Sequence, residues 1–476
     1  MEYSELWLDR SGTKTDADIG AAIAWSDGGA RVKNAVDELK YALTAMTGRE
    51  PKLIRSGDFD GRGILLRARG EGEDFEIYRR GETLVIEGGD AGVLYGAFAL
   101  IRALACGDKE LCTKQSPSKP LRMLDHWDNA DGSIERGYSG NSFFFRDGKL
   151  LVNERSAVYA RLLASVGINA AAINNVNVRG PATRLITQEY YEPLGKLSEL
   201  FDGYGIKLFL SLNYAAPMEI GGLDSADPLD EKVAGWWKER MAETFTALPK
   251  LGGFVVKADS EGRPGPFTYG RTHADGANML ARAVKPYGGR IIWRCFVYNC
   301  QQDWRDLKTD RARACCDNFE PLDGQFDDNV ILQIKNGPVD FQVREPVSPL
   351  FGRLKKTNCM VEFQIAQEYT GQQRHVCYLI DWFRQVLGTH MYNGEEKDTV
   401  GDIVCGLTAV SNTGDDYNWT GHDLAGANLY GFGRLAWDSS LSAERIAREW
   451  ISLYYGRDGE VSDTVCDILM RSWPAY

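Results

Sequence analysis

The sequence has no long hydrophobic run and no excess of positive charge. Its most apolar segment, residues 91–106, contains Arg102 and is too short to cross a bilayer, so we expect no membrane partner. The first residues, MEYSELWLDRSG, show no basic region followed by an apolar stretch, which predicts a cytoplasmic protein without a secretory signal. The net charge of −12 argues against nucleic acid and anionic membranes as partners. A small acidic ligand is compatible with it, because the charge inside a pocket can oppose the net charge.

Motifs for metal binding and for nucleophilic catalysis are missing as well. Of the five histidines, His126 and His273 lie near charged stretches, but no HxH or HExxH pattern surrounds them. The ten cysteines include the adjacent pair Cys315 and Cys316, and their spacings match no zinc or thioredoxin pattern. Buried free thiols in a reducing compartment are therefore expected. We expect no metal and no cofactor.

After Pro120 the sequence repeats a pattern of strand, loop and helix. The predicted strands lie at residues 121–125, 168–173, 207–212, 253–256, 290–296, 330–334, 359–365 and 403–410. The predicted helices between them lie at residues 154–166, 192–204, 230–247, 274–287 and 373–387. Apolar strands that alternate with amphipathic helices indicate a parallel sheet covered by helices. Eight such units favour an α/β fold of the (β/α)8 TIM barrel type over a doubly wound sheet, and no GxGxxG or P-loop follows the first strand.

The length of 476 residues predicts more than one domain. We predict a smaller α+β domain at residues 1–118, a catalytic barrel at 119–440 and the start of a truncated C-terminal helical region at 441–476. Residues 107–120, which are rich in lysine, are predicted to be a linker. The elements predicted in the first domain are helices at residues 30–48 and 91–105 and strands at residues 63–67, 75–80 and 83–88.

Polar side chains follow the predicted strands at the end where a barrel places its active site. The fourth strand lies in GGFVVKADSE, which ends in Lys257, Asp259 and Glu261 and opens onto a segment rich in Pro and Gly. The polar or aromatic residues that end or follow the other strands are Asp125, His126, Trp127, Asp128, Asn129, Asn174, Asn175, Asn213, Arg294, Lys335, Asp340, Glu368, Ser411 and Asn412. Each of them alone is more often solvated than functional, but their common location indicates a site.

This set of residues is typical of a carbohydrate-processing site. One protonated carboxyl group can donate to a leaving oxygen while another carboxylate acts on the anomeric side. Lys257, Arg294 and Lys335 carry more positive charge than a neutral sugar needs, and they could bind a substrate that bears a carboxylate. The alternative is that each cation only neutralises a neighbouring acid.

Four longer segments carry a specific resemblance to a known family. They are LDHWDNADGSIERGYSGNSFFF (124–145), VVKADSEGRPGPFTYGRTHADGANMLA (255–281), GPVDFQVREPVSPLF (337–351) and FQIAQEYTGQ (363–372). All four resemble signature stretches of the glycoside hydrolase family 67 α-glucuronidases. The resemblance implies an α+β domain, a (β/α)8 barrel and a mostly helical C-terminal domain. It also implies release of α-1,2-linked glucuronic acid, or its 4-O-methyl ether, from xylooligosaccharides with inversion.

The resemblance implies catalytic roles for three carboxylates. Glu261 matches the general acid of the family, and Asp340 and Glu368 match two carboxylates that activate water. An inverting enzyme needs its acid and base roughly 6.5–9.5 Å apart, a distance that carboxylates on different strands can span across a barrel mouth. Glu261 must be protonated near neutral pH, for which Asp259 is a candidate like-charge neighbour unless its side chain points away as structural support. Asp340 and Glu368 must be ionised, which Lys335 favours, and the sequence leaves open which of them takes the proton.

For substrate binding, the resemblance implies that Lys257, Arg294 and Lys335 contact the uronate and the sugar, and that Trp127 forms an aromatic wall. The expected partner is a small molecule, an aldouronic acid or a glucuronoxylan oligosaccharide. Two alternatives stay open, a hydrolase of another α-linked uronide and a truncated, non-catalytic uronide-binding protein. Family members continue well beyond Tyr476 into a domain that mediates dimer formation, so the homodimer of full-length members is not predicted for this chain.

Overall fold

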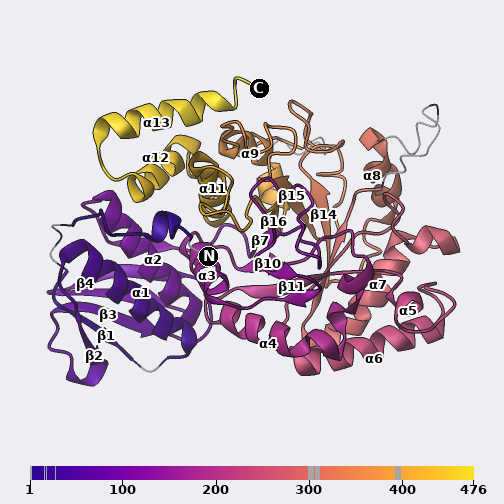
Figure 1. Cartoon of the computed structure of the whole chain (residues 1–476), viewed down its shortest axis with the longest axis horizontal. Coiled ribbons are helices and arrows are strands. Elements are labelled where there is room, and N and C mark those ends of the chain that lie inside the picture. Colours follow the sequence, from indigo (N-terminus) through magenta and orange to yellow (C-terminus); the bar gives the residue numbers. More distant parts are fainter. Residues whose placement is uncertain are drawn as a thin grey trace.

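The computed structural model describes residues 3–15, 17, 19–26, 28–297, 305, 311–391 and 398–476. Figure 1 shows an N-terminal unit (indigo) at one end of the long axis and a barrel (magenta to orange) toward the other. The last helices of the chain (yellow) lie along the side of the molecule that joins these two parts. Across the described residues, every helix is too short or too polar to span a bilayer.

The N-terminal unit is a six-stranded sheet in the order β2-β1-β3-β5-β4-β6 with two helices. Its elements are β1 (Ala22–Trp25), α1 (Ala30–Thr47), β2 (Lys52–Arg55), β3 (Gly63–Ala68), β4 (Phe75–Arg80), β5 (Thr83–Gly88), α2 (Asp90–Cys106) and β6 (Thr113–Gln115). The predicted helices and strands are confirmed. The pattern does not predict β1 and β2, which have only four residues each and no clear alternation of buried and exposed positions. β6 lies in the segment predicted as a linker, where it pairs antiparallel with β4 as an edge strand.

Eight parallel strands close into the barrel in the order β10-β11-β12-β13-β14-β15-β16-β7, which confirms the predicted fold. They are β7 (Leu121–Asp125), β10 (Ala170–Ala172), β11 (Lys207–Leu212), β12 (Gly253–Val256), β13 (Arg290–Arg294), β14 (Val330–Lys335), β15 (Cys359–Gln364) and β16 (Gly406–Val410). Parallel pairing brings the carboxyl ends of all eight strands to one rim. β16 starts later than predicted because Thr399 caps a short helix, α10 (Val400–Ile403), just before it.

Helices cover the outside of the barrel and form the C-terminal end of the chain. They are α3 (Glu154–Ser165), α4 (Gln188–Asp202), α5 (Ala216–Glu219), α6 (Glu231–Ala247), α7 (His273–Val284), α8 (Arg311–Phe319), α9 (Ile380–Leu387), α11 (Gly426–Trp437), α12 (Ala443–Tyr454) and α13 (Gly459–Ser472). The helix predicted at residues 373–387 begins only at residue 380. Gln372 and Gln373 have φ of 50° and 51°, so the chain turns there instead of forming a helix.

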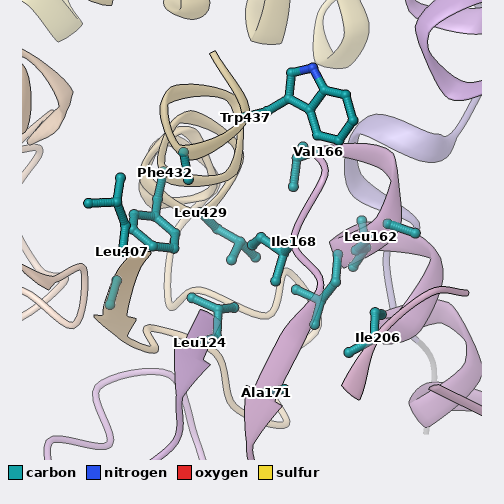
Figure 2. Close-up of a cluster of buried hydrophobic side chains, with 14 of the residues drawn as sticks. Leu124, Leu162, Val166, Ile168, Ala171, Ile206, Leu407, Leu429, Phe432 and Trp437 are labelled. Carbon is teal, nitrogen blue, oxygen red and sulfur yellow. The ribbon is translucent and has the colours of Figure 1, made fainter. Parts of the chain in front are cut away.

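Helix α11 completes the core between the barrel and the N-terminal unit. All twelve of its residues are buried, so it has no polar face, and its pattern does not predict an amphipathic helix. Figure 2 shows Leu429 and Phe432 of this helix beside Leu124 of β7 and Leu407 of β16. A Cβ atom at Gly433 would lie 2.3 Å from Val166, so glycine is needed for this close approach.

Trp437, the last residue of α11, connects the barrel to the N-terminal sheet. Its ring lies 4.9 Å from that of Tyr95 and 6.0 Å from that of Phe75. Beside it, Arg122 of β7 forms an ion pair with Glu73 at 2.6 Å, although its own side chain is fully buried. Aromatic stacking and this ion pair hold the N-terminal unit against the barrel.

Candidate active site

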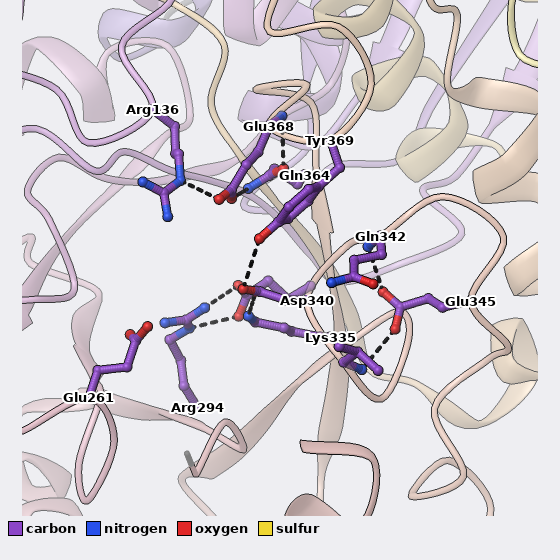
Figure 3. A network of polar contacts seen from close by, with 12 residues as sticks. Arg136, Glu261, Arg294, Lys335, Asp340, Gln342, Glu345, Gln364, Glu368 and Tyr369 are labelled. Atoms are coloured by element: carbon purple, nitrogen blue, oxygen red, sulfur yellow. Dashed lines mark hydrogen bonds and ion pairs between the residues drawn. The ribbon is translucent and has the colours of Figure 1, made fainter. Parts of the chain in front are cut away.

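The loops that follow three different strands bring the predicted carboxylates to the rim of the barrel. Glu261 lies in the loop after β12, Asp340 in the loop after β14 and Glu368 in the loop after β15. Figure 3 shows Asp340 and Glu368 within one polar network and Glu261 across the mouth from them. The carboxylate predictions therefore fall in one region, as the barrel topology requires.

Asp340 is held by a cation and a phenol. The ammonium of Lys335, at the end of β14, forms an ion pair with Asp340, and the Tyr369 hydroxyl donates to it at 3.4 Å. Lys335 is buried, with its Nζ 3.3 Å from the ring centroid of Phe296. Burial lowers the pKa of Lys335, against the attraction of Asp340. The negative charge of Asp340 is the favourable counter-charge for this buried ammonium.

Glu368 has a separate set of donors. The Nε of Arg136 lies 2.7 Å from Glu368 Oε1, and the side-chain amide of Gln364 donates to Oε2 at 3.1 Å. The backbone N–H of Glu368 donates to the side-chain Oε1 of Gln364 at 3.2 Å, so the two residues hold each other in place. Glu368 is about one-tenth exposed. The carboxylate is therefore held by an ion pair on one side and by an amide hydrogen bond on the other.

Glu345 supports the loop that carries Asp340. Its carboxylate accepts hydrogen bonds from the backbone N–H groups of Val339 at 2.7 Å and Gln342 at 2.9 Å, on either side of Asp340 (Figure 3). Burial raises the pKa of Glu345, against these backbone donors. The residue thus fixes the backbone from which Asp340 projects.

The fourth-strand loop places Glu261 beside a buried lysine. Lys257 forms an ion pair with Glu261 and also donates to the side-chain Oδ1 of Asn177 at 2.8 Å. Burial alone would raise the pKa of Glu261, but attraction by Lys257, with smaller contributions from Lys335 and Arg294, outweighs it and lowers the pKa. Glu261 is therefore a carboxylate in this arrangement, which differs from the protonated state that a general acid needs.

Asp259 is not a like-charge neighbour that raises the pKa of Glu261. It accepts a hydrogen bond from the backbone N–H of Phe267 at 3.1 Å, and its Oδ2 lies 4.0 Å from Nδ1 of His273. Burial raises the pKa of Asp259 to about 6. Its side chain supports the loop, which is the second of the two roles considered for it.

Arg294 and Trp127 lie deeper in the barrel than the three carboxylates. The guanidinium of Arg294 grips Glu362 through two hydrogen bonds, the longer of which is 2.8 Å, and both side chains are 1% exposed. Its Cζ lies 5.4 Å from the ring centroid of Trp127, which is itself buried. Gln333 donates to Glu362 at 2.6 Å and to Asp125 at 3.3 Å. Arg294 thus neutralises an interior acid, and its contact with a substrate stays a prediction.

Asp125 is a second carboxylate in this interior layer. Burial and the nearby charge of Glu362 raise the pKa of Asp125 to about 7, although Arg294 opposes the shift. Burial also acts on Glu362, but Arg294 outweighs it and lowers the pKa of Glu362. The signal for this layer in the sequence is the glutamate of CMVEFQ, a charged residue within a strand that is buried throughout.

A cavity of about 780 Å³ opens beside Glu261, and neither Asp340 nor Glu368 is among its lining residues. It is lined by Asp128, Asn129, Ala130, Asp131, Glu135, Asp147, Gly148, Asn175, Asn177, Val178, Arg179, Pro181, Ala182 and Glu261. Most of these residues come from the loops that follow β7 and β10. Within the described part of the chain, no group of three or more His, Cys, Asp or Glu side chains could hold a metal ion.

The chain is thus a (β/α)8 barrel with carboxylates and cations gathered at the rim where the strands end. In barrels of this class, that rim is the usual place of the active site. The profile described as "Glycosyl hydrolase family 67 middle domain" matches residues 105–419, and that described as "Glycosyl hydrolase family 67 C-terminus" matches residues 420–476. The chain belongs to glycosyl hydrolase family 67.

Curated relatives agree with this membership. The chain is 45% identical over 412 residues to Alpha-glucuronidase A of Emericella nidulans, covering 83% of this chain and 48% of that protein. It is 43% identical over 417 residues to Alpha-glucuronidase A of Aspergillus tubingensis, covering 85% of this chain and 49% of that protein. The chain thus spans about half the length of the curated relatives it matches.

Solved structures with similar folds are far more distant in sequence. The GH20 β-N-acetylhexosaminidase from Streptomyces coelicolor superposes with a TM-score of 0.55 at 12% identity, covering 97% of each chain. A GH138 enzyme targeting pectin rhamnogalacturonan II superposes with a TM-score of 0.58 at 13% identity, covering 94% of this chain and 54% of that one. At these identities the likeness concerns the fold alone.

Proposed function

We propose that this chain is an inverting α-glucuronidase that releases α-1,2-linked glucuronic acid, or its 4-O-methyl ether, from xylooligosaccharides. The observation that carries the proposal is that three carboxylates from the loops after separate strands each form an ion pair with a cation at the barrel mouth, two of these cations being buried lysines. Membership of family 67 and relatives named Alpha-glucuronidase A support the same activity.

The proposed mechanism uses Glu261 as general acid. Its proton passes to the glycosidic oxygen of the departing xylose unit as the bond to the anomeric carbon breaks. Asp340 and Glu368, across the mouth, orient a water molecule, and one of them accepts its proton as the oxygen attacks the anomeric carbon. Attack on the face opposite to the leaving group converts the α-linkage into a β-configured product.

The cations at the mouth support a substrate that carries a carboxylate. Lys257 and Lys335 both reach the mouth from strand ends and are buried in the protein, so a uronate carboxylate would meet positive charge of low hydration there. Arg294 adds a third positive charge in the layer beneath the mouth, where it forms an ion pair with Glu362. Trp127 lies against the guanidinium of Arg294. The cavity beside Glu261 has the volume and the amide groups to accept the leaving xylooligosaccharide.

The test is an assay with a product readout. The purified chain should release glucuronic acid from aldouronic acids, and proton NMR during the first minutes should show the β-anomer before mutarotation. Release from α-linked galacturonides at a higher rate would favour a different uronide hydrolase. Heat of binding for glucuronic acid in a calorimeter without any released sugar would favour a non-catalytic uronide-binding protein.

A further inference from the structure

One ammonium group at the mouth is assigned two roles that compete with each other. Lys257 forms an ion pair with Glu261, the residue that must give up a proton. The same Lys257 is one of the cations assigned to the carboxylate of the substrate, so this inference rests on the proposed function. A carboxylate that is paired with an ammonium favours its charged form and is a poor proton donor.

The position of Lys257 is fixed from the opposite side. Its side chain is 3% exposed, and its Nζ also donates to the side-chain Oδ1 of Asn177 at 2.8 Å. The amide N–H of Asn177 in turn donates to Glu135 at 3.0 Å, which sets the orientation of the amide. The ammonium is therefore held in place, and the partner that can move is the carboxylate.

Glu261 is the more exposed member of this pair. Its side chain is 39% exposed, whereas Asp340 beside Lys335 is 14% exposed and Glu362 beside Arg294 is 1% exposed. The other two cations thus hold acids that are largely enclosed by the protein. An incoming carboxylate can displace Glu261 at a lower cost than it can displace either of those acids.

We propose that the uronate carboxylate of the substrate replaces Glu261 on Lys257, and that Glu261 becomes a general acid only when this exchange has taken place. The freed carboxylate of Glu261 takes one proton from solvent, to which it is accessible. That proton later goes to the leaving glycosidic oxygen, while the base takes one proton from the attacking water and returns it to solvent. No other reactant is needed for the balance.

The charges that face Glu261 agree with this exchange. Lys257, Lys335 and Arg294 all lower its pKa in the ligand-free site, while burial acts in the opposite direction. A bound uronate would neutralise Lys257 and place a second negative charge nearby, and both changes favour the protonated form of Glu261. The preference for a uronide over a neutral glycoside would then appear in kcat as well as in KM, because a neutral sugar leaves Glu261 ionised.

Calorimetry in two buffers of different ionisation enthalpy tests the exchange, because it counts the protons taken up on binding. Glucuronic acid is the probe and glucose is its neutral control, both at about pH 6.5, where free glucuronate is ionised. Wild-type protein should take up about one proton per glucuronate bound and none with glucose. Glu261→Gln and Lys257→Met should each reduce the proton uptake at least several-fold. The first variant lacks the carboxylate that takes up the proton. In the second, this carboxylate has no ion pair with Lys257 even before glucuronate binds.

The control variant is Lys196→Met, which removes another lysine four residues from a glutamate, Glu192, on the exposed side of α4. It should take up protons as the wild type does. Glucuronate binding to wild-type protein without proton uptake, or with uptake that survives in Glu261→Gln, would overturn the exchange while release of glucuronic acid from aldouronic acids upholds the proposed function. Absence of both binding and release would overturn the two together.

Discussion

The guanidinium of Arg136 meets the carboxylate of Glu368 at 2.7 Å between Nε and Oε1, although the two residues lie on loops after the first and seventh strands of the barrel. Arg136 has a φ of 65°, so its backbone is in a conformation that few non-glycine residues adopt. The contact therefore fixes the orientation of a proposed catalytic carboxylate from a distant part of the chain.

Arg136→Gln should lower kcat about 10- to 100-fold with little change in KM, because Glu368 loses the group that orients it toward water. Arg136→Lys should restore part of the lost rate. Steady-state kinetics on an aldouronic acid measure both. Arg471→Gln is the matched control, since Arg471 contacts Asp467 on α13 through the same atoms at 2.7 Å but is exposed. A kcat of Arg136→Gln equal to that of the control would show that Glu368 needs no such positioning.

Glu261→Ala should lose activity according to the leaving group. On xylooligosaccharides, whose alkoxide leaving group needs a proton, we expect a loss of about 100- to 10,000-fold. On an aryl α-glucuronide with an acidic phenol the loss should be far smaller, because the leaving group departs without protonation. Glu192→Ala, which removes an exposed glutamate on α4, should leave both rates unchanged. An equal loss on the two substrates would contradict the role of general acid.

Several features of this site depend on contacts that no local pattern contains. The strands of the barrel and the polar residues after them could be predicted, because each strand is a short apolar run that ends in charged or neutral polar residues. The positioning roles of Arg136, Glu345 and Glu362 could not be predicted, since their partners lie on other loops or strands. Glu362 stands out as a charge in a buried strand, but only the barrel closure shows that Arg294 neutralises it.

The state of Glu261 illustrates the same limit. The chemistry of glycoside hydrolysis requires a protonated acid, and the sequence offered Asp259 as the neighbour that could raise its pKa. In the structure Lys257, four residues earlier, reaches Glu261 across the loop, while Asp259 turns to the backbone of Phe267. The residue spacing allows either arrangement, and it does not reveal the left-handed backbone at Asp259 and Glu261, whose φ angles are 51° and 50°.

Glucuronate binding should weaken more steeply above about pH 8 than below it. Burial, aided by the positive charge of Arg294, lowers the pKa of Lys257 to about 8, against the attraction of Glu261. The charged form that attracts a carboxylate is thus present below that pH and is lost as the pH rises through it. We expect loss of the Lys257 charge to raise the Kd of glucuronic acid by up to about a further 10-fold per pH unit above this point, in addition to the rise at lower pH that proton uptake by Glu261 causes.

Calorimetric titrations at pH 6.5, 7.5, 8.5 and 9.5 would measure this dependence, with xylose as a neutral ligand whose affinity should not follow it. Lys335 also has a pKa lowered by burial and adds to the effect at the upper end. Lys257→Met should therefore bind glucuronate more weakly at pH 6.5 and show a flatter profile below pH 9. A wild-type Kd that is constant over the range would rule out Lys257 as the carboxylate-binding group.

Asp125→Asn should stabilise the protein at alkaline pH. The pKa of Asp125 is raised from 3.8 to about 7 by burial and by Glu362, so the folded state binds a proton that the unfolded state has released. The stability that this proton supplies is complete below the unfolded pKa and is lost as the pH rises through the folded one. The asparagine side chain has the same shape, carries no charge at any pH and offers N–H donors to the side-chain oxygen of Gln333, which has no hydrogen-bond partner among the described residues. Relative to wild type, its free energy of unfolding should increase by about 2 kcal/mol more at pH 8.5 than at pH 5.

Urea denaturation at both pH values measures the difference, with Asp467→Asn on the exposed face of α13 as the control that should show none. The same change in stability at the two pH values would mean that Asp125 is ionised throughout, held by Arg294 in spite of its burial.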